Sequence, residues 1–419
     1  MAETSNLKQH HYITKKRYSA MLIFCIFCAQ FAYSTIIYNL KHITNFDLFW
    51  VAFYHTAALF FAIPQAGLSD NQGRKKHLLI ALLCILLAVL LFLVSYFLAK
   101  MSLISTSEFS FSLLTALPIC LFLGVAGNVI PIARAGLTDL KIHDFRIAMG
   151  WSTTFIGFGW VAPILLGLIF FPAGVITSLI LFLLISLISI KKHFFDQEDL
   201  NIKKAPQFKK IIKNSYLWFI SMFLVTGGAS ALFAYVFSEI SFYQVYLLTA
   251  EGIIENETQV VGLIMAFGYA FGIIMQWIIY NSDESGVKFG SLFSFLSLFI
   301  LFLLKISINY HYLTLPTKTY FIIEGLFNFL FSFGFGFLIP SLFSLMARKI
   351  RPHHAGRLFG AIDIMDTLAL NGSALILFFK EKLKFNDSID YTIALCLFLT
   401  SIFCYKNFLR RFSSYEKSL

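Results

Sequence analysis

Twelve apolar stretches, each about as long as one bilayer crossing, constrain this chain of 419 residues more than any other feature. A helix that spans the hydrocarbon core needs about 20 mostly apolar residues. The stretches form two sets of six, near 18–40, 48–66, 77–99, 113–133, 147–168 and 170–190, and near 214–247, 259–280, 289–309, 319–343, 357–379 and 389–408. A transmembrane β-barrel would instead show alternating segments of ~10 residues. We therefore expect an all-α membrane protein with twelve transmembrane helices in two six-helix bundles.

Composition supports the membrane assignment. Charged residues make up 13% of the chain and hydrophobic residues 58%, with a mean hydropathy of +0.77. A soluble domain typically has about 25% charged residues. The first apolar stretch is a full span, and no small-residue cleavage site follows it, so we expect it to be a retained helix rather than a signal peptide.

The distribution of cations predicts the orientation. With a cytoplasmic amino terminus, the inner segments hold 26 of the 33 Lys and Arg residues and the outer loops hold 6. These inner segments are the tail to Arg17, 67–77, 134–146, 191–213, 281–288, 345–357 and the residues after Tyr405. This excess follows the positive-inside rule with both termini cytoplasmic, and we expect a bacterial inner membrane. The cations are spread over seven segments, which argues against a nucleic-acid-binding face.

The polar segment 191–213 separates the two sets of spans. It is the longest polar stretch, and we expect a cytoplasmic linker that lies on the anionic inner leaflet. The predicted organisation is therefore an amino-terminal bundle over 1–190, the linker over 191–213, and a carboxy-terminal bundle over 214–419.

The stretch 67–76, with the sequence GLSDNQGRKK, lies between the second and third spans. We expect Gly67 and Gly73 to permit a tight turn and a close approach of helices. Asp70 is expected at the start of the third helix, where a carboxylate meets the positive helix end. Arg74, Lys75 and Lys76 are expected to contact lipid phosphates. The alternative is an ordinary basic hairpin without a specific role.

This stretch resembles the loop between the second and third helices of the major facilitator superfamily, which reads Gly-x-x-x-Asp-Arg/Lys-x-Gly-Arg-Arg/Lys. The matching positions are Gly67, Asp70, Gly73, Arg74 and Lys75, whereas Asn71 stands where the family usually has a cation. The resemblance covers nearly the whole chain and implies the twelve-helix fold of that family. It also implies that these five residues form a latch, in which Asp70 and Arg74 link the two halves in one conformation and release them in the other.

Weak internal similarity agrees with two related halves. Asp70 and Gly73 match Asp283 and Gly286, each pair lying between the second and third spans of its set. A second match joins Pro131, Arg146 and Gly150 to Pro340, Arg357 and Gly360. Two matches in the same order indicate duplication, as in the parallel halves of facilitator-type transporters.

Ionisable groups inside spans are costly and are therefore candidate sites. Asp363 and Asp366 lie three residues apart in the eleventh span, on one helical face. Two such carboxylates can hold a proton near neutral pH, which makes them candidates for proton coupling, together with Glu239 in the seventh span. The alternative is a static inner-face network in which the aspartates pair with Arg357, Arg348 or Arg134.

Polar side chains within the spans are candidates for substrate contact. The resemblance implies that the first, fourth, seventh and tenth helices line a central cavity. On these helices lie the candidates Gln30, Tyr33, Asn128, Tyr243 and Asn328. Each could instead form an interhelical hydrogen bond. Arg134, near the inner end of the fourth span, is a snorkelling end residue or else a partner for Asp139 or for an anionic substrate.

No pattern of an enzyme or of a metal site is evident. The pairs His10-His11 and His353-His354 lack further ligands at metal spacing. The six cysteines lie in apolar spans, and we expect buried small hydrophobic residues rather than redox or metal chemistry for them. We thus expect neither catalytic residues nor a metal nor a cofactor.

Together these features predict a secondary active transporter that moves a small organic solute by alternating access. We expect a monomer coupled to protons, a symporter whose partners are substrate, protons and membrane lipid. Import is favoured because the family's exporter pattern is degraded here, with Ala162 replacing an expected glycine and Cys120 near an expected arginine. The alternatives are proton-driven efflux of drugs or metabolites and a non-transporting membrane enzyme or sensor.

The orientation is testable by cysteine labelling. In a chain whose native cysteines are replaced, a single cysteine between 191 and 213 should react with a membrane-impermeant maleimide only from the cytoplasmic side. A cysteine at Lys100, in an expected outer loop, is the control and should react only from outside. Labelling of 191–213 from outside would reverse the predicted topology.

Overall fold

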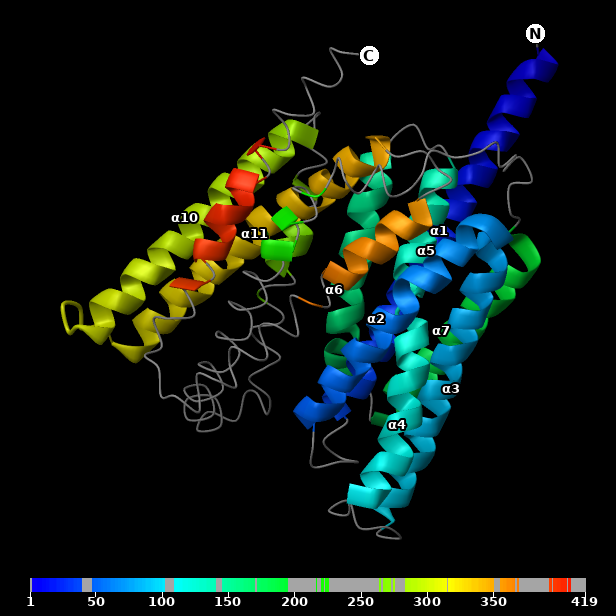
Figure 1. Ribbon diagram of the computed structural model, residues 1–419, viewed down its shortest axis with the longest axis horizontal. Coiled ribbons are helices and arrows are strands. Elements are labelled where there is room, and N and C mark those ends of the chain that lie inside the picture. Colours follow the sequence, from blue (N-terminus) through cyan, green and yellow to red (C-terminus); the bar gives the residue numbers. More distant parts are fainter. Residues whose placement is uncertain are drawn as a thin grey trace. The chain divides into compact units, whose positions relative to one another are not determined.

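The computed structural model describes most of the first half of the chain and parts of the second (Figure 1). The described residues are 2–39, 47–101, 109–140, 145–169, 172–194, 283–314, 316–349 and 355–365, with scattered positions and short helical pieces in 216–275 and 368–407. These residues form two compact units. Unit 1 comprises Met1–Lys203 and Phe343–Ile364, and unit 2 comprises Lys204–Leu342 and Met365–Leu419.

Unit 1 contains seven labelled helices within its described residues. They are α1 (Ala2–Asn39), α2 (Asp47–Gln72), α3 (Arg74–Lys100), α4 (Phe109–Ala126), α5 (Val129–Asp139), α6 (Phe145–Ile169) and α7 (Pro172–His193). The start of the eleventh predicted span, helical over 355–365, also belongs to this unit, as does the end of α11 from Phe343. The second-half segment 343–364 therefore packs with first-half helices.

Within unit 1, α1 packs against α5, α6 and α7, and α4 packs against α2 and α3. Small residues permit the closest approaches. A Cβ on Gly124 of α4 would lie 2.7 Å from Ala57 Cβ of α2, and a Cβ on Gly159 of α6 would lie 2.6 Å from Gln30 Cβ of α1. Aromatic rings fill the space around these contacts, as where Phe27 of α1 meets Phe155 of α6 edge to face at 6.1 Å. Close backbone approach with interleaved rings is how helices associate where lipid supplies no hydrophobic drive.

The predicted span near 113–133 is interrupted in the structure. The helix breaks at Gly127 and Asn128, between α4 and α5. Pro131 accounts for the break, since it has no N–H to donate to the carbonyl of Gly127. At the break, the Asn128 side chain donates from Nδ2 to the Val125 carbonyl at 2.9 Å.

In unit 2, α10 (Asp283–Asn309) packs against α11 (Thr317–Lys349), whose residues up to Leu342 belong to this unit. Gly290 and Gly334 bring the two backbones together, since a Cβ on Gly290 would lie 2.6 Å from the Gly334 carbonyl oxygen. Ser294 Oγ donates to the Phe331 carbonyl at 3.3 Å across the same interface. Rings of Phe289, Phe293 and Phe333 surround the contact.

Several predicted spans match helices, though with longer bounds. Within the described residues, six helices are long and apolar enough to cross a membrane: Lys15–Ile36, Arg74–Ala99, Leu114–Asp139, Gly174–His193, Ser285–Ile308 and Gly325–Leu345. The greater part of each predicted span near 214–247 and 259–280 lies outside the described residues. The segment 195–213 also lies outside them. The boundaries 1–190, 191–213 and 214–419 stay a prediction.

The cysteine prediction is only partly right. Cys25, Cys28 and Cys120 are buried, and Cys28 Sγ lies 3.3 Å from Ser186 Oγ. Cys396, however, is exposed, and Cys84 and Cys404 are half-buried. An apolar span has a lipid-facing side as well as a packed side, so membership in a span did not fix burial.

The α2–α4 contact predicts an asymmetry between two Gly→Ala substitutions. Gly124→Ala should destabilise the protein by about 1–3 kcal/mol, because the new methyl carbon would lie 3.1 Å from the backbone carbonyl carbon of Ala57. Gly325→Ala in α11 is the control, since its Cβ would meet only Ile264 Cδ1 at 3.8 Å. Thermal unfolding in detergent should give a lower Tm for the first variant alone. Equal Tm values would show that Gly124 is not needed for this packing.

Candidate functional site

A single residue, Gly73, connects α2 to α3. Gly73 has φ 93° and ψ 147°, a region open almost only to glycine, and helix continues on both sides of it. The predicted turn is therefore confirmed but is much shorter than 67–76. The prediction that Asp70 starts the third helix is wrong, because Asp70 lies in the last turn of α2. Gly67 is accommodated within the helix, so α2 runs past Asp70 to Gln72.

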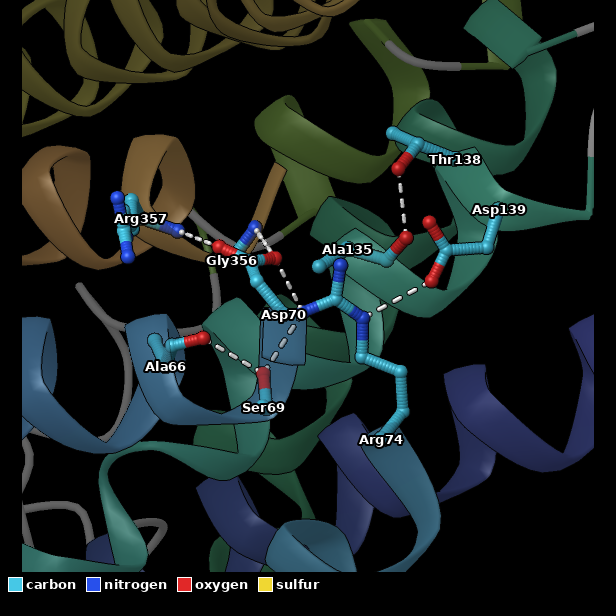
Figure 2. A network of polar contacts seen from close by, with 9 residues as sticks. All are labelled: Ala66, Ser69, Asp70, Arg74, Ala135, Thr138, Asp139, Gly356 and Arg357. Atoms are coloured by element: carbon cyan, nitrogen blue, oxygen red, sulfur yellow. Dashed lines mark hydrogen bonds and ion pairs between the residues drawn. The ribbon is translucent and has the colours of Figure 1, made fainter. Parts of the chain in front are cut away.

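Asp70 caps a different helix, the one over 355–365. Its Oδ1 accepts a hydrogen bond from the Gly356 N–H at 2.9 Å, and its Oδ2 accepts one from the Arg357 N–H at 3.1 Å (Figure 2). The first N–H groups of a helix have no partners within it and carry partial positive charge. A carboxylate with 3% exposure therefore satisfies two of them at once.

Arg74 links Asp70 to α5. Its Nη1 lies 2.6 Å from Asp70 Oδ1 and donates to Ser69 Oγ at 2.7 Å, while its Nε donates to Asp139 Oδ2 at 2.9 Å. Figure 2 shows the guanidinium between the two carboxylates. Arg74 is only 3% exposed. The prediction that Arg74 contacts lipid phosphate is therefore wrong, because two acidic side chains hold it inside the protein.

Two glycines allow the helix over 355–365 to approach this network. A Cβ on Gly356 would contact the Ala66 carbonyl oxygen and would lie 2.6 Å from Arg74 Nη1 and 2.7 Å from Asp70 Oδ1. A Cβ on Gly67 would lie 3.2 Å from Arg357 Cγ. Gly67 is thus a residue of close approach within α2 rather than of a turn. Lys75, the fifth latch residue, is half-buried at the start of α3.

Arg134 is buried in α5 and does not snorkel, so that sequence interpretation is wrong. It has 5% exposure, and its Nε donates to Ser152 Oγ of α6 at 3.3 Å. Its guanidinium carbon lies 4.5 Å from the centre of the Phe343 ring, a cation–π contact. Asp139, one of the partners considered for Arg134, is bound by Arg74.

A second polar cluster in unit 1 surrounds Tyr54 of α2. The rings of Tyr33 and Tyr54 lie 4.6 Å apart, and the Tyr54 hydroxyl is 3.6 Å from where a Cβ on Gly127 would lie. Asp363 is close enough to Tyr54 for the two to interact electrostatically. The structure therefore brings together Tyr33 and Asp363, which the sequence singled out for different roles. Tyr54 was missed because it lies on the second span, whereas the candidates were taken from the first, fourth, seventh and tenth.

The remaining candidates divide between buried positions and positions that the structure does not describe. Gln30, Asn128 and Asn328 are buried at 7%, 0% and 1% exposure. The Asn128 Oδ1 atom has no hydrogen-bond partner within the structure. Glu239, Tyr243 and Asp366 lie outside the described residues.

Among the residues that the structure describes, no group of three or more His, Cys, Asp or Glu side chains could hold a metal ion. The ionic network joins the end of α2, the start of α3, the end of α5 and the helix over 355–365 into one largely buried cluster. Four helices in the described part of unit 1 are long and apolar enough to cross a membrane, so this cluster belongs to a multi-pass membrane protein.

Comparison with known proteins gives the family. The model of the Major Facilitator Superfamily matches residues 16–370, and the chain belongs to that family. It is accordingly a multi-pass transporter rather than an enzyme, with the all-helical fold predicted from the sequence. Among curated proteins, none matches the sequence significantly.

Solved structures with a similar fold include three transporters of different description. A bacterial homologue of the iron transporter ferroportin, in an outward-facing state with soaked iron, has a TM-score of 0.70 at 14% identity and covers 94% of this chain and 98% of its own. The E. coli fucose:proton symporter FucP has a TM-score of 0.65 at 13% identity, with 93% and 98% covered. The human organic anion transporter TETRAN has a TM-score of 0.64 at 15% identity, with 93% and 99% covered. At this identity the likeness shows the fold alone.

The buried network predicts a specific non-additivity. Arg74→Gln should destabilise the protein by about 3–5 kcal/mol, because it leaves the buried carboxylate of Asp70 and the half-buried carboxylate of Asp139 without their cation. Arg74→Gln combined with Asp139→Asn should regain part of that loss, since one unpaired charge is removed. Thermal unfolding of both variants checks this. A double variant no more stable than Arg74→Gln would show that Asp139 is not an essential partner.

Proposed function

We propose that this protein is a secondary active transporter that carries a small organic solute across the cytoplasmic membrane by alternating access, coupled to protons. Import is the favoured direction. In this proposal the protein acts as a monomer in a bacterial inner membrane with both termini cytoplasmic, and its bundles are 1–190 and 214–419, joined by the linker 191–213.

The observation that carries the proposal is the hydrogen bonding of Asp70 to the backbone of Gly356 and Arg357. These groups come from opposite halves of the sequence, and one carboxylate accepts both N–H groups. In this proposal the contact breaks when water reaches it, because water then solvates the carboxylate and the helix end. A buried charge that is stable in one arrangement and hydrated in another can act as a two-state element.

The remaining latch residues support this role. Arg74 holds the Asp70 carboxylate in position and connects it to Asp139 at the end of α5. Gly67 and Gly356 leave the space in which the two segments meet. In this proposal Lys75 meets lipid headgroups at the inner face, and release of Asp70 accompanies opening of the cytoplasmic side.

Asp363 is the proposed proton carrier among the described residues. It is half-buried in the helix over 355–365, seven positions after Gly356, and it interacts with Tyr54. Asp363 lies on the same helix that Asp70 caps. A proton on the Asp363 carboxylate would change its interaction with Tyr54 of α2. Protonation and release of the latch can therefore influence each other. Asp366 and Glu239 are the further proton-coupling candidates.

The proposed substrate contacts are Gln30, Tyr33, Asn128, Arg134, Tyr243 and Asn328. Asn128 is the best supported of these. A fully buried amide oxygen without a partner is unusual, and an unmet acceptor is suited to receive a donor from a polar solute. Tyr33, whose ring lies 4.6 Å from that of Tyr54, would present an aromatic face to the same solute.

Efflux is the second candidate. The glycine- and proline-containing helix α6, with Gly150, Gly157, Gly159 and Pro163, loosely resembles the exporter pattern of the family. Ala162 and Cys120 depart from that pattern, which favours import. The fucose:proton symporter among the similar structures supports proton-driven uptake as a function that this fold can perform.

Proton coupling is tested by uptake. A thermal-shift screen of metabolites identifies a ligand, and its accumulation in proteoliposomes is then measured with an imposed pH gradient. Asp363→Asn together with Asp366→Asn should abolish accumulation above equilibrium while leaving counterflow intact. Asp363→Glu, which keeps a carboxylate, is the matched control and should retain accumulation. Gradient-driven accumulation that survives the double substitution contradicts the proposed role of both aspartates.

A further inference from the structure

The contact of Arg134 with Phe343 is the most specific feature that the latch does not include. Arg134 belongs to α5, whereas Phe343 lies in the last part of α11. The guanidinium carbon is 4.5 Å from the ring centre. The side chains have 5% and 2% exposure, so the contact excludes water. A guanidinium over an aromatic face is more strongly bound when both groups are desolvated.

Phe343 also contacts the helix that Asp70 caps. Its ring meets the ring of Phe359 edge to face at 6.5 Å, and Phe359 is 1% exposed. Phe359 lies one helical turn after Gly356, whose N–H is bonded to Asp70. The segment 343–364 is therefore held at two places, by Asp70 at the start of the helix over 355–365 and by Arg134 through Phe343.

α5 connects these two places. Asp139 at its end binds Arg74 of the latch at 2.9 Å, and Arg134 lies five residues earlier on the same helix. Ser152 of α6 accepts from Arg134 Nε and itself donates to the Met149 carbonyl. The hydrogen bond from Arg134 Nε to Ser152 orients the guanidinium. The guanidinium carbon then lies over the Phe343 ring.

We propose that the Arg134–Phe343 contact is a second closure of the transporter, which stabilises the same conformation as the Asp70 latch. This inference rests on the proposed alternating-access function. Arg134 is thus a positioning residue for the conformational change. In the alternative conformation Phe343 moves away from α5, and water hydrates the Arg134 guanidinium in place of the aromatic ring.

A cysteine reporter in place of Ala355 can measure this closure. Ala355 is 3% exposed at the start of the helix over 355–365, so a cysteine there is shielded while both closures hold. In a chain without its native cysteines, in inside-out vesicles, the rate of labelling by an impermeant maleimide should follow the population of the open conformation. Phe343→Leu and Arg134→Gln should each raise this rate by about threefold to thirtyfold, the range set by a desolvated cation–π contact.

Four further variants give the expected pattern its specificity. The double variant Arg134→Gln with Phe343→Leu should label no faster than the faster single variant, because both remove one contact. Phe343→Trp should slow labelling, since indole binds cations better than a phenyl ring. Phe331→Leu is the matched control, because Phe331 is 1% exposed on the same helix and meets Phe335. Asp70→Asn should speed labelling and should add to the effect of Phe343→Leu.

The outcomes separate this inference from the proposed function. Faster labelling in Asp70→Asn with unchanged labelling in Phe343→Leu, Arg134→Gln and Phe343→Trp overturns the second closure and leaves the latch in place. Unchanged labelling in all variants, Asp70→Asn included, overturns the latch as well. Equal acceleration by Phe331→Leu and Phe343→Leu overturns the inference too, because it would reduce the effect to loss of aromatic volume.

Discussion

The structure of unit 1 depends on a buried cation, Arg74, that lies between two carboxylates. Asp70 is buried and Asp139 is half-buried, and a buried charge without a partner is costly. Arg74 solves this by dividing its guanidinium between the two carboxylates. Asp70 then uses its remaining bonding capacity on the start of the helix over 355–365. These ionic contacts thereby fix the position of the helix over 355–365, which is distant in sequence.

Steric fit is the second condition for this arrangement. The chain has 50 phenylalanines, and the places where backbones meet are kept clear by residues without a side chain or with a small one. Gly356 is the clearest case, since even a methyl group would meet Ala66, Arg74 and Asp70. The bulky ring of Phe343 lies nearby in sequence but performs the opposite task, covering Arg134. The packing at this site needs both the missing side chain at Gly356 and the bulky ring at Phe343.

The sequence predicted the class of fold, and it predicted those spans that the described residues contain as long apolar helices, because hydrophobic length is a local signal. It misplaced Asp70 by one helix, since a one-residue connection at Gly73 cannot be distinguished from a longer loop by composition. The partners Asp139 and Gly356 were not assigned to this network, because Asp139 is 65 positions from Arg74 and Gly356 is 286 positions from Asp70 along the chain. Arg134 was placed near the surface for a similar reason, since only packing reveals that Phe343 covers it.

The joint at Gly73 has a mechanical consequence. With one non-helical residue between α2 and α3, these spans lack the slack that would let either rotate about its own axis alone. A force on the Asp70 carboxylate, near the joint between α2 and α3, is therefore transmitted along both helices together. A small displacement at the end where Gly73 joins α2 to α3 can therefore become a larger displacement at the far ends of these two helices, because each helix acts as a lever.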